Sequence, residues 1–254
     1  MSNRGYIDLY IEFTSKSKQD QVVRLLQELS SLGYTGAAIA CNIDGEFLDE
    51  KKIVEYFNFT TNLIREVRSK NVDIEVYHRL NIISDNIKFI KKVLRKFRRS
   101  FNIIGVNPCN SLNAARFAAR DRRVDVIFFN LKVFSKFFDE SQAKLMSSTG
   151  VFLEIPFNKL FRGRSLTLPF RVLRKTLQIA KKYNVHIVLS SAAHSIFDMI
   201  SPLQLMSTLT VLGIGLDDVK SYLTLNPKFI IERSKHRMSR NHIIPGVDVI
   251  EGVH

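Results

Sequence analysis

The chain has 254 residues, of which 45% are hydrophobic and 24% are charged, a composition that is typical of globular proteins and excludes an intrinsically disordered one. Its 38 Lys and Arg exceed its 24 Asp and Glu, which gives a formal net charge of +14. Two cysteines exclude a disulfide framework, and no apolar run approaches the roughly 20 residues that span a bilayer. The first residues show no secretory signal. We therefore expect a basic, intracellular protein without membrane contact.

The positive charge is concentrated in three blocks. Residues 79–123 hold 12 basic against 2 acidic residues, residues 159–182 hold 8 against none, and residues 228–240 hold 5 against 1. So uneven a charge favours a polyanionic partner such as nucleic acid, because each neutralised phosphate releases counterions. The alternative is that these are solvated faces that only keep the protein soluble.

Short β-branched or aromatic runs alternate with longer helical patterns along the chain. Several of the runs are almost continuously apolar, as expected for parallel strands that are covered on both faces. The predicted strands are residues 6–13, 36–41, 73–77, 103–106, 124–129, 151–155 and 186–189. The predicted helices are residues 22–32, 53–68, 87–97, 112–120, 140–147, 170–183, 202–212, 216–223 and 228–237.

This alternation predicts an α/β fold with a parallel sheet. A TIM-like barrel of seven to eight parallel strands with extra C-terminal helices is the favoured architecture, and an open doubly wound sheet is the alternative. We expect one barrel domain over residues 1–237 and a C-terminal tail, partly disordered, over residues 238–254.

Known catalytic motifs are missing from the sequence. It contains no Gly-rich phosphate loop, no H-x-H pair and no H-E-x-x-H pair. His78 and His194 follow the third and seventh predicted strands, so both could face the same barrel mouth, and His194 is a candidate for a phosphate or ribose contact. A metal-dependent phosphoesterase, the alternative function, would need Asp8, Glu12, His78 and His194 as ligands. We predict no catalytic residue, and no metal or cofactor bound by this chain.

Arginines dominate the basic residues that follow the fourth and sixth predicted strands, which suits bidentate phosphate recognition. The face that holds Lys88, Lys91, Lys92, Arg95 and Lys96 lies opposite the apolar stripe of one helix, where a solvated exterior is an equally good explanation. The predicted RNA-binding residues are Arg116, Arg120, Arg122, Arg123, Arg162, Arg164, Arg171, His194, Lys235 and Arg237.

Several short segments together resemble the ribonuclease P protein component 3 family. They are Val188-Leu189-Ser190-Ser191-Ala192-Ala193, Ser201-Pro202-Leu203-Gln204-Leu205, Leu212-Gly213, and Asn226-Pro227 before a basic helix. The resemblance covers about residues 6–237. One departure is Ile200, where the family commonly has an arginine, so any RNA contact of that arginine does not carry over.

The resemblance implies a barrel similar to that of the polymerase-and-histidinol-phosphatase enzymes, with Tyr10 and Glu12 where those enzymes have their H-x-H pair. It also implies an RNA-binding, non-catalytic subunit of the endoribonuclease that removes the 5′ leader from precursor tRNA, with Mg²⁺ held by the RNA. The implied partners are ribonuclease P RNA, protein component 2, other protein subunits and, indirectly, precursor tRNA. The location would be cytoplasmic in an archaeon, which the short chain favours, or nuclear and nucleolar in a eukaryote. A pure protein scaffold stays a further alternative.

Overall fold

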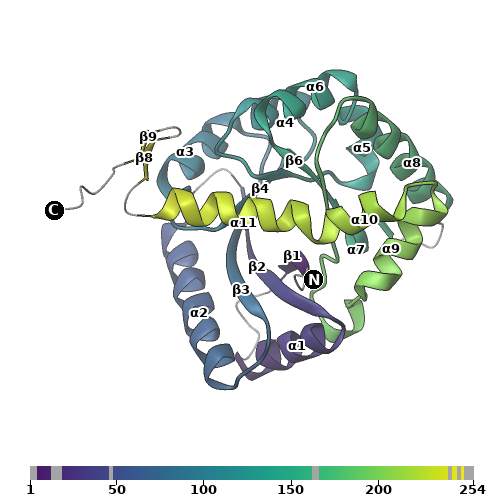
Figure 1. The fold of residues 1–254 in the computed structure, drawn as a ribbon. Helices are drawn as coiled ribbons and strands as arrows, with labels where there is room; N and C mark the ends of the chain where they lie inside the picture. Colours follow the sequence, from purple (N-terminus) through teal and green to yellow (C-terminus); the bar gives the residue numbers. More distant parts are fainter. Residues whose placement is uncertain are drawn as a thin grey trace.

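Seven parallel strands form the centre of the molecule (Figure 1). The computed structural model describes residues 5–12, 19–45, 48–161, 166–239, 242–244 and 247–248. The strands follow one another around the sheet in sequence order. Their bounds are β1 Tyr6–Glu12, β2 Tyr34–Asp44, β3 Glu75–Ile83, β4 Ile103–Asn107, β5 Val126–Ile127, β6 Phe152–Pro156 and β7 Ile187–Ser190.

The sheet closes on itself. Ile11 of β1 pairs in parallel with Ala193, just after β7, and the backbone N–H of Glu12 donates to the Ala193 carbonyl oxygen over 2.7 Å. The predicted TIM-like barrel is therefore confirmed, with seven parallel strands in the described part of the chain.

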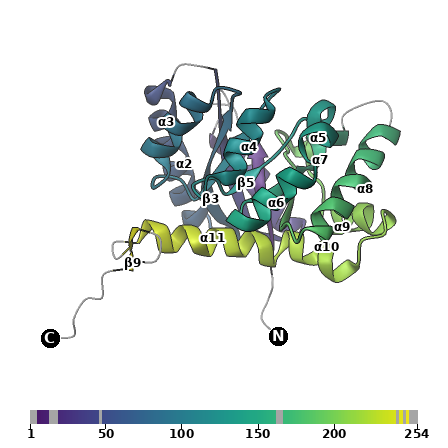
Figure 2. The same cartoon turned by 90° about the horizontal axis from the view of Figure 1, so that it is seen from above.

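Helices cover the outside of the barrel (Figures 1 and 2). Their bounds are α1 Gln19–Ser31, α2 Glu50–Ser69, α3 Ile87–Phe97, α4 Leu112–Arg120, α5 Leu131–Phe137, α6 Glu140–Thr149, α7 Phe157–Phe161, α8 Thr167–Lys182, α9 Pro202–Val211, α10 Leu216–Leu223 and α11 Leu225–Met238, with a 3₁₀ turn, η1, at Ile196–Asp198. The sequence did not predict α5 and α7, because helices this short show no apolar period. None of the helices in the described ranges has the length and apolar character needed to cross a bilayer.

Beyond α11, β8 (His242–Ile244) and β9 (Val247–Asp248) form an antiparallel pair. The rest of the expected C-terminal tail lies outside the described residues. The division into one domain and a tail stays a prediction.

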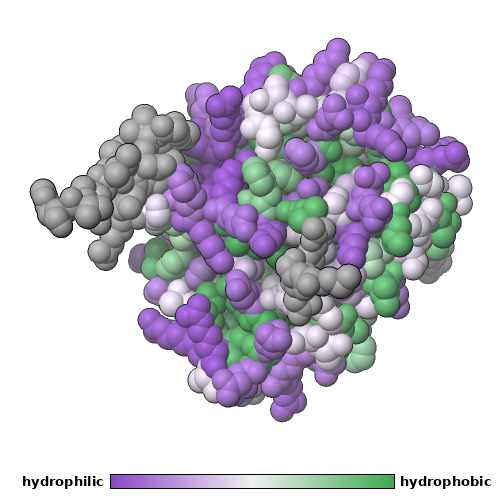
Figure 3. All heavy atoms as spheres, viewed as in Figure 1, coloured by the Kyte–Doolittle hydropathy of each residue, from purple (hydrophilic) through white to green (hydrophobic). Residues whose placement is uncertain are grey.

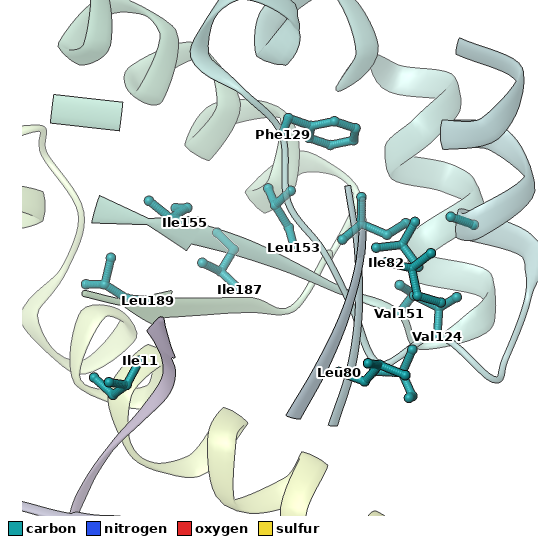
Figure 4. Close-up of a cluster of buried hydrophobic side chains, with 14 of the residues drawn as sticks. Ile11, Leu80, Ile82, Val124, Phe129, Val151, Leu153, Ile155, Ile187 and Leu189 are labelled. Atoms are coloured by element: carbon teal, nitrogen blue, oxygen red, sulfur yellow. The ribbon is translucent and has the colours of Figure 1, made fainter. Parts of the chain in front are cut away.

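Side-chain alternation along the strands creates two apolar layers. Outward residues such as Leu80, Ile82, Leu153 and Leu189 are buried between the strands and the surrounding helices (Figure 4). Inward residues at the N-terminal ends of the strands form a second cluster, which includes Ile230 and Ile231 of α11. Figure 2 shows α11 lying across this end of the barrel. The N-terminal opening is therefore closed by a helix, and the opposite end is the mouth where chemistry is found in barrels of this kind.

A β-bulge in β1 changes which side chains enter the barrel. The pairing with β2 joins Asp8 to Ala37 and Ile11 to Ile39, so that three steps in β1 match two in β2. Because of this extra residue, Leu9 and Tyr10 both belong to the clusters inside the barrel.

Candidate nucleic-acid interface

An ion pair between Arg79 of β3 and Glu154 of β6 lies in the barrel interior, and both side chains are fully buried. The Arg79 guanidinium donates to the two carboxylate oxygens of Glu154 over 2.6 and 2.5 Å, to the Leu9 carbonyl oxygen over 2.6 Å and to Asn81 Oδ1 over 2.8 Å. The Tyr10 ring centroid lies 4.3 Å from its Cζ atom. Buried charges are tolerated when they are paired and hydrogen-bonded in this way. The pair therefore fills the middle of the barrel below the mouth.

A chain of polar contacts crosses the mouth above this pair. The Asn81 amide donates to Asn42 Oδ1 over 2.9 Å, and the Asn42 amide donates to Glu12 Oε1 over 2.6 Å. Glu12 Oε2 lies 2.7 Å from Nζ of Lys159 on α7. Burial alone would lower the pKa of Lys159, but Tyr10 and Glu12 outweigh it and raise that pKa. The Glu12 carboxylate is thus compensated by an ammonium group of the chain itself.

The structure does not bring together the residues that a metal-dependent phosphoesterase would require. Asp8 accepts a hydrogen bond from the backbone N–H of Ser191 over 3.2 Å, and burial raises its pKa to about 6. His194 lies on the loop after β7, with Nε2 3.6 Å from Asp198. Among the described residues, no three His, Cys, Asp or Glu side chains are arranged to hold a metal ion. The barrel mouth does not fit the phosphoesterase alternative.

The expectation that His78 faces the same mouth as His194 is wrong. β3 extends to Ile83, well past the predicted end at residue 77, so His78 lies within the strand. Because Arg79 points into the barrel, its neighbour His78 points outward, where its ring stacks on Phe57 of α2 with the centroids 4.4 Å apart. Burial lowers the pKa of His78 to about 4. His78 is therefore a neutral part of the packing between β3 and α2.

Three arginines converge on the buried Asp125 carboxylate. Arg98 donates to both carboxylate oxygens over 2.7 and 2.6 Å, Arg233 donates over 2.9 Å, and a guanidinium nitrogen of Arg237 lies 3.8 Å away. Burial alone would raise the pKa of Asp125, but the three guanidinium groups outweigh it and lower that pKa. Arg233 and Arg237 belong to α11, so the cluster fixes this helix to the barrel. The side chain of Arg237 is only 12% exposed. Its contact with RNA stays a prediction.

Two other predicted RNA-binding residues also contact acceptors within the chain. Arg116 of α4 donates to Gln142 Oε1 over 2.7 Å and to Asp139 Oδ2 over 2.6 Å, which ties α4 to the start of α6. Lys235 of α11 lies 3.6 Å from Glu75, but its side chain is 59% exposed. Arg116 therefore has a structural role within the chain, and Lys235 is accessible to a ligand; RNA binding by either residue stays a prediction.

The remaining predicted cations lie on the outside of the barrel. Arg120 and Arg122 are exposed at the end of α4 and just beyond it, and Arg171 is exposed on α8. Arg123 is held by Asp121, to which it donates over 2.9 and 2.6 Å. These residues keep their predicted RNA-binding role as an untested prediction. Arg162 and Arg164 lie outside the described residues.

Polar and apolar residues are unevenly distributed on the surface. Figure 3 shows the face that α11 crosses, where hydrophilic residues cover most of α11 and of the side of the barrel formed by α2 and α3. Apolar surface shows at the right of the view over α9 and α10, where Leu203, Val211 and Leu216 are exposed, and again at the lower centre beside α2. The surface over α9 and α10 is therefore more apolar than the surface over α11.

The sequence reasoning missed two features. Nothing predicted the Arg79–Glu154 pair, although Glu154 interrupts the otherwise apolar strand β6, which is a usable signal for a buried charge. The second feature is that exposed cations of α3 lie beside Arg123. The sequence left open whether this face of α3 binds RNA or is only solvated. The signal for the second feature is that residues 86–120 contain no acidic residue.

These features define a class of protein: a closed seven-stranded TIM-type barrel, with an internal ion pair and a basic exterior. A family model described as RNase P subunit p30 matches residues 5–239. The chain belongs to this ribonuclease P subunit family.

Individual relatives and structures agree with this family. The chain is 29% identical over 235 residues to "Ribonuclease P protein component 3" of Methanosarcina mazei, covering 89% of this chain and 90% of the relative. It is 23% identical to "Ribonuclease P protein subunit drpp30" of Dictyostelium discoideum, covering 87% of this chain and 62% of the relative. The fold resembles a chain in a cryo-EM structure of archaeal ribonuclease P with mature tRNA, with a TM-score of 0.76, 22% identity and coverage of 97% and 98%.

A histidinol phosphate phosphatase from Lactococcus lactis, in complex with zinc, L-histidinol and phosphate, shares the fold with a TM-score of 0.56 and 11% identity, covering 91% of this chain and 94% of the phosphatase. This likeness supports the predicted similarity to the phosphatase barrel. It concerns the fold alone, since the mouth of this chain holds Asn42, Asn81, Glu12 and Lys159 in mutual contact.

Proposed function

We propose that this chain is a non-catalytic, RNA-binding protein subunit of ribonuclease P that supports the catalytic RNA in removing the 5′ leader from precursor tRNA. Membership of the ribonuclease P subunit family supports the assignment to this enzyme. The observation that carries the RNA-binding role is the division of the charges. The fold uses Arg79, Arg98, Arg116 and Arg237 in internal contacts, while other cations are exposed on the outer helices.

The chemistry of this role is electrostatic. Exposed guanidinium and ammonium groups neutralise phosphates of a folded RNA and release its counterions. Such contacts position an RNA without reading its sequence, because folded RNA is recognised mainly through its shape and backbone. By reducing the repulsion between RNA strands, the protein lowers the Mg²⁺ concentration at which the RNA, which holds the catalytic metal, becomes active.

The proposed partners are ribonuclease P RNA, protein component 2 and further protein subunits, with precursor tRNA contacted indirectly. We place the protein in the cytoplasm if its host is an archaeon, as the many archaeal relatives suggest, and in the nucleus and nucleolus if the host is a eukaryote.

Reconstitution tests the function. The RNA subunit and the companion proteins are assayed for cleavage of labelled precursor tRNA, with and without this chain, over a Mg²⁺ titration. We expect the chain to shift the Mg²⁺ requirement to lower concentration, and the chain alone to leave the substrate intact. An unchanged titration curve, or cleavage by the purified chain alone, would refute the proposal.

A further inference from the structure

On the outside of the barrel lies a shallow groove whose lining, within the described ranges, consists of cationic side chains. Its volume is about 450 Å³, and its lining consists of Lys88, Lys91, Lys92 and Arg95 of α3 together with Arg123. The α3 cations are spaced so that all four share one helix face. The fold holds this face outward, because the opposite face of α3 is buried in the core. The four α3 cations are therefore exposed together on the surface.

Few contacts within the chain neutralise this charge. Among the described residues, Lys88, Lys92 and Arg95 form no ion pair. Lys91 lies over the Phe117 ring, with Nζ 5.2 Å from its centroid. Arg123 comes from the connection between α4 and β5, where its bidentate bond to a carboxylate fixes the guanidinium at one side of the groove. Like charges this close repel one another, so an anion that enters the groove relieves an unfavourable interaction.

We propose that this α3 groove binds the phosphate backbone of the folded RNA; the inference rests on the proposed function and names the surface that would carry it. Among the described residues, the lining contains no aromatic ring on which a base could stack, and no side-chain amide or carboxylate that could read a base edge. Lys88 and Arg95 are separated by seven residues, or roughly 10 Å along the helix axis, which lets the four α3 cations contact successive phosphates of one strand. Binding is then independent of sequence.

The helix α8 offers a matched control. Its exposed cations include Arg174, Lys175 and Lys181, which are one arginine and two lysines. The test set of Lys88, Lys92 and Arg95 has the same composition. α3 and α8 lie on opposite sides of the barrel (Figures 1 and 2). Replacing three cations by glutamine on either helix changes the net charge equally. A difference between the two variants therefore reports position and not total charge.

The experiment measures RNA affinity of the full chain against salt concentration, from about 50 to 200 mM. The probes are the cognate ribonuclease P RNA and two RNA hairpins of equal length and unrelated sequence. The test variant is Lys88→Gln/Lys92→Gln/Arg95→Gln, the matched control is Arg174→Gln/Lys175→Gln/Lys181→Gln, and Lys88→Arg/Lys92→Arg keeps the groove charge. Unfolding midpoints in urea confirm that each variant is folded.

We expect the test variant to reduce the slope of log K against log salt by about 2 to 3, at roughly 0.9 per lost phosphate contact, and to weaken binding about 10²-fold near 0.15 M salt. The α8 control should change the slope by less than about 1, and Lys88→Arg/Lys92→Arg should bind like the wild type.

Other outcomes separate the two proposals. Equal losses in both triple variants, or no loss in the test variant while the wild type binds RNA in a salt-dependent manner, would overturn the groove and leave the proposed function standing. A strong preference for one hairpin would also contradict a backbone site. If the wild-type chain shows no salt-dependent RNA binding, the proposed RNA-binding function itself fails.

Discussion

Removing one partner of the buried Arg79–Glu154 pair should destabilise the protein strongly. Glu154→Leu leaves a buried guanidinium that donates to the Leu9 carbonyl oxygen and to Asn81 Oδ1 but has no counter-charge. Breaking a buried pair from one side costs about 3–5 kcal/mol, which is a large part of the 5–15 kcal/mol that stabilises a typical domain. Arg79→Met should cost at least as much, because it leaves a buried carboxylate and removes the donor from both acceptors.

The double variant Arg79→Met/Glu154→Leu removes both charges and should be more stable than either single variant. It should still be less stable than the wild type, because the Leu9 carbonyl oxygen and the Asn81 amide oxygen lose their hydrogen-bond donor, which costs about 1–3 kcal/mol each. The predicted coupling in a double-mutant cycle is therefore at least about 2 kcal/mol.

The assay is urea unfolding of the wild type and the three variants, followed by precursor tRNA cleavage with the reconstituted enzyme. The exposed pair of Lys228 and Glu232, with side chains 65% and 60% exposed, is the control, and its removal should cost less than about 1 kcal/mol. If the double variant lost as much stability as the two single variants together, the two residues would not be coupled and this explanation of the pair would be refuted. If the folded double variant no longer supported cleavage, the barrel interior would have a role in the reaction that we do not assign to it.

Further predictions concern buried ionisable groups and one glycine. The pKa of the Asp8 carboxyl is raised to about 6, so the folded protein binds a proton at Asp8 more tightly than the unfolded chain does. The free energy of unfolding should therefore rise by about 3 kcal/mol as the pH falls from about 6 to 4. Asp8→Asn should remove this rise, as measured by urea unfolding at pH 4–7. The pKa of His78 is lowered to about 4, so the protein loses stability as the pH falls from about 6.5 to 4. His78→Phe should remove this loss, so that the variant gains stability relative to the wild type as the pH falls in the same urea measurements. Asp125→Asn should cost more than about 3 kcal/mol in urea unfolding, because three guanidinium groups lose their common counter-charge, while the exposed Asp73→Asn should change stability by less than about 0.5 kcal/mol. Gly105→Ala should lower the thermal midpoint, because an added Cβ would clash with Asn81 Oδ1 and lie 2.9 Å from a guanidinium nitrogen of Arg79. An unchanged midpoint would contradict the close packing around the ion pair.

The amino-acid sequence by itself determined the order and kind of the main elements. Apolar runs and helical periods are local, so the seven strands and the basic outer face of α3 could be predicted from neighbouring residues. The family resemblance was likewise visible in short segments whose order and spacing survive without a structure. The class of fold and the ribonuclease P assignment both followed from this local information.

Only the tertiary structure decided which charges are used internally. Arg79 and its partner Glu154 are 75 residues apart in the chain, and no local pattern links them. The orientation of His78 depends on its place in β3, because a shift of one residue turns a side chain to the other face of a strand. Arg116 and Arg237 looked like free cations until the folded chain placed carboxylates beside them. Local periodicity specifies which face of an element is apolar, but the pairing of charges depends on which elements the closed barrel brings together.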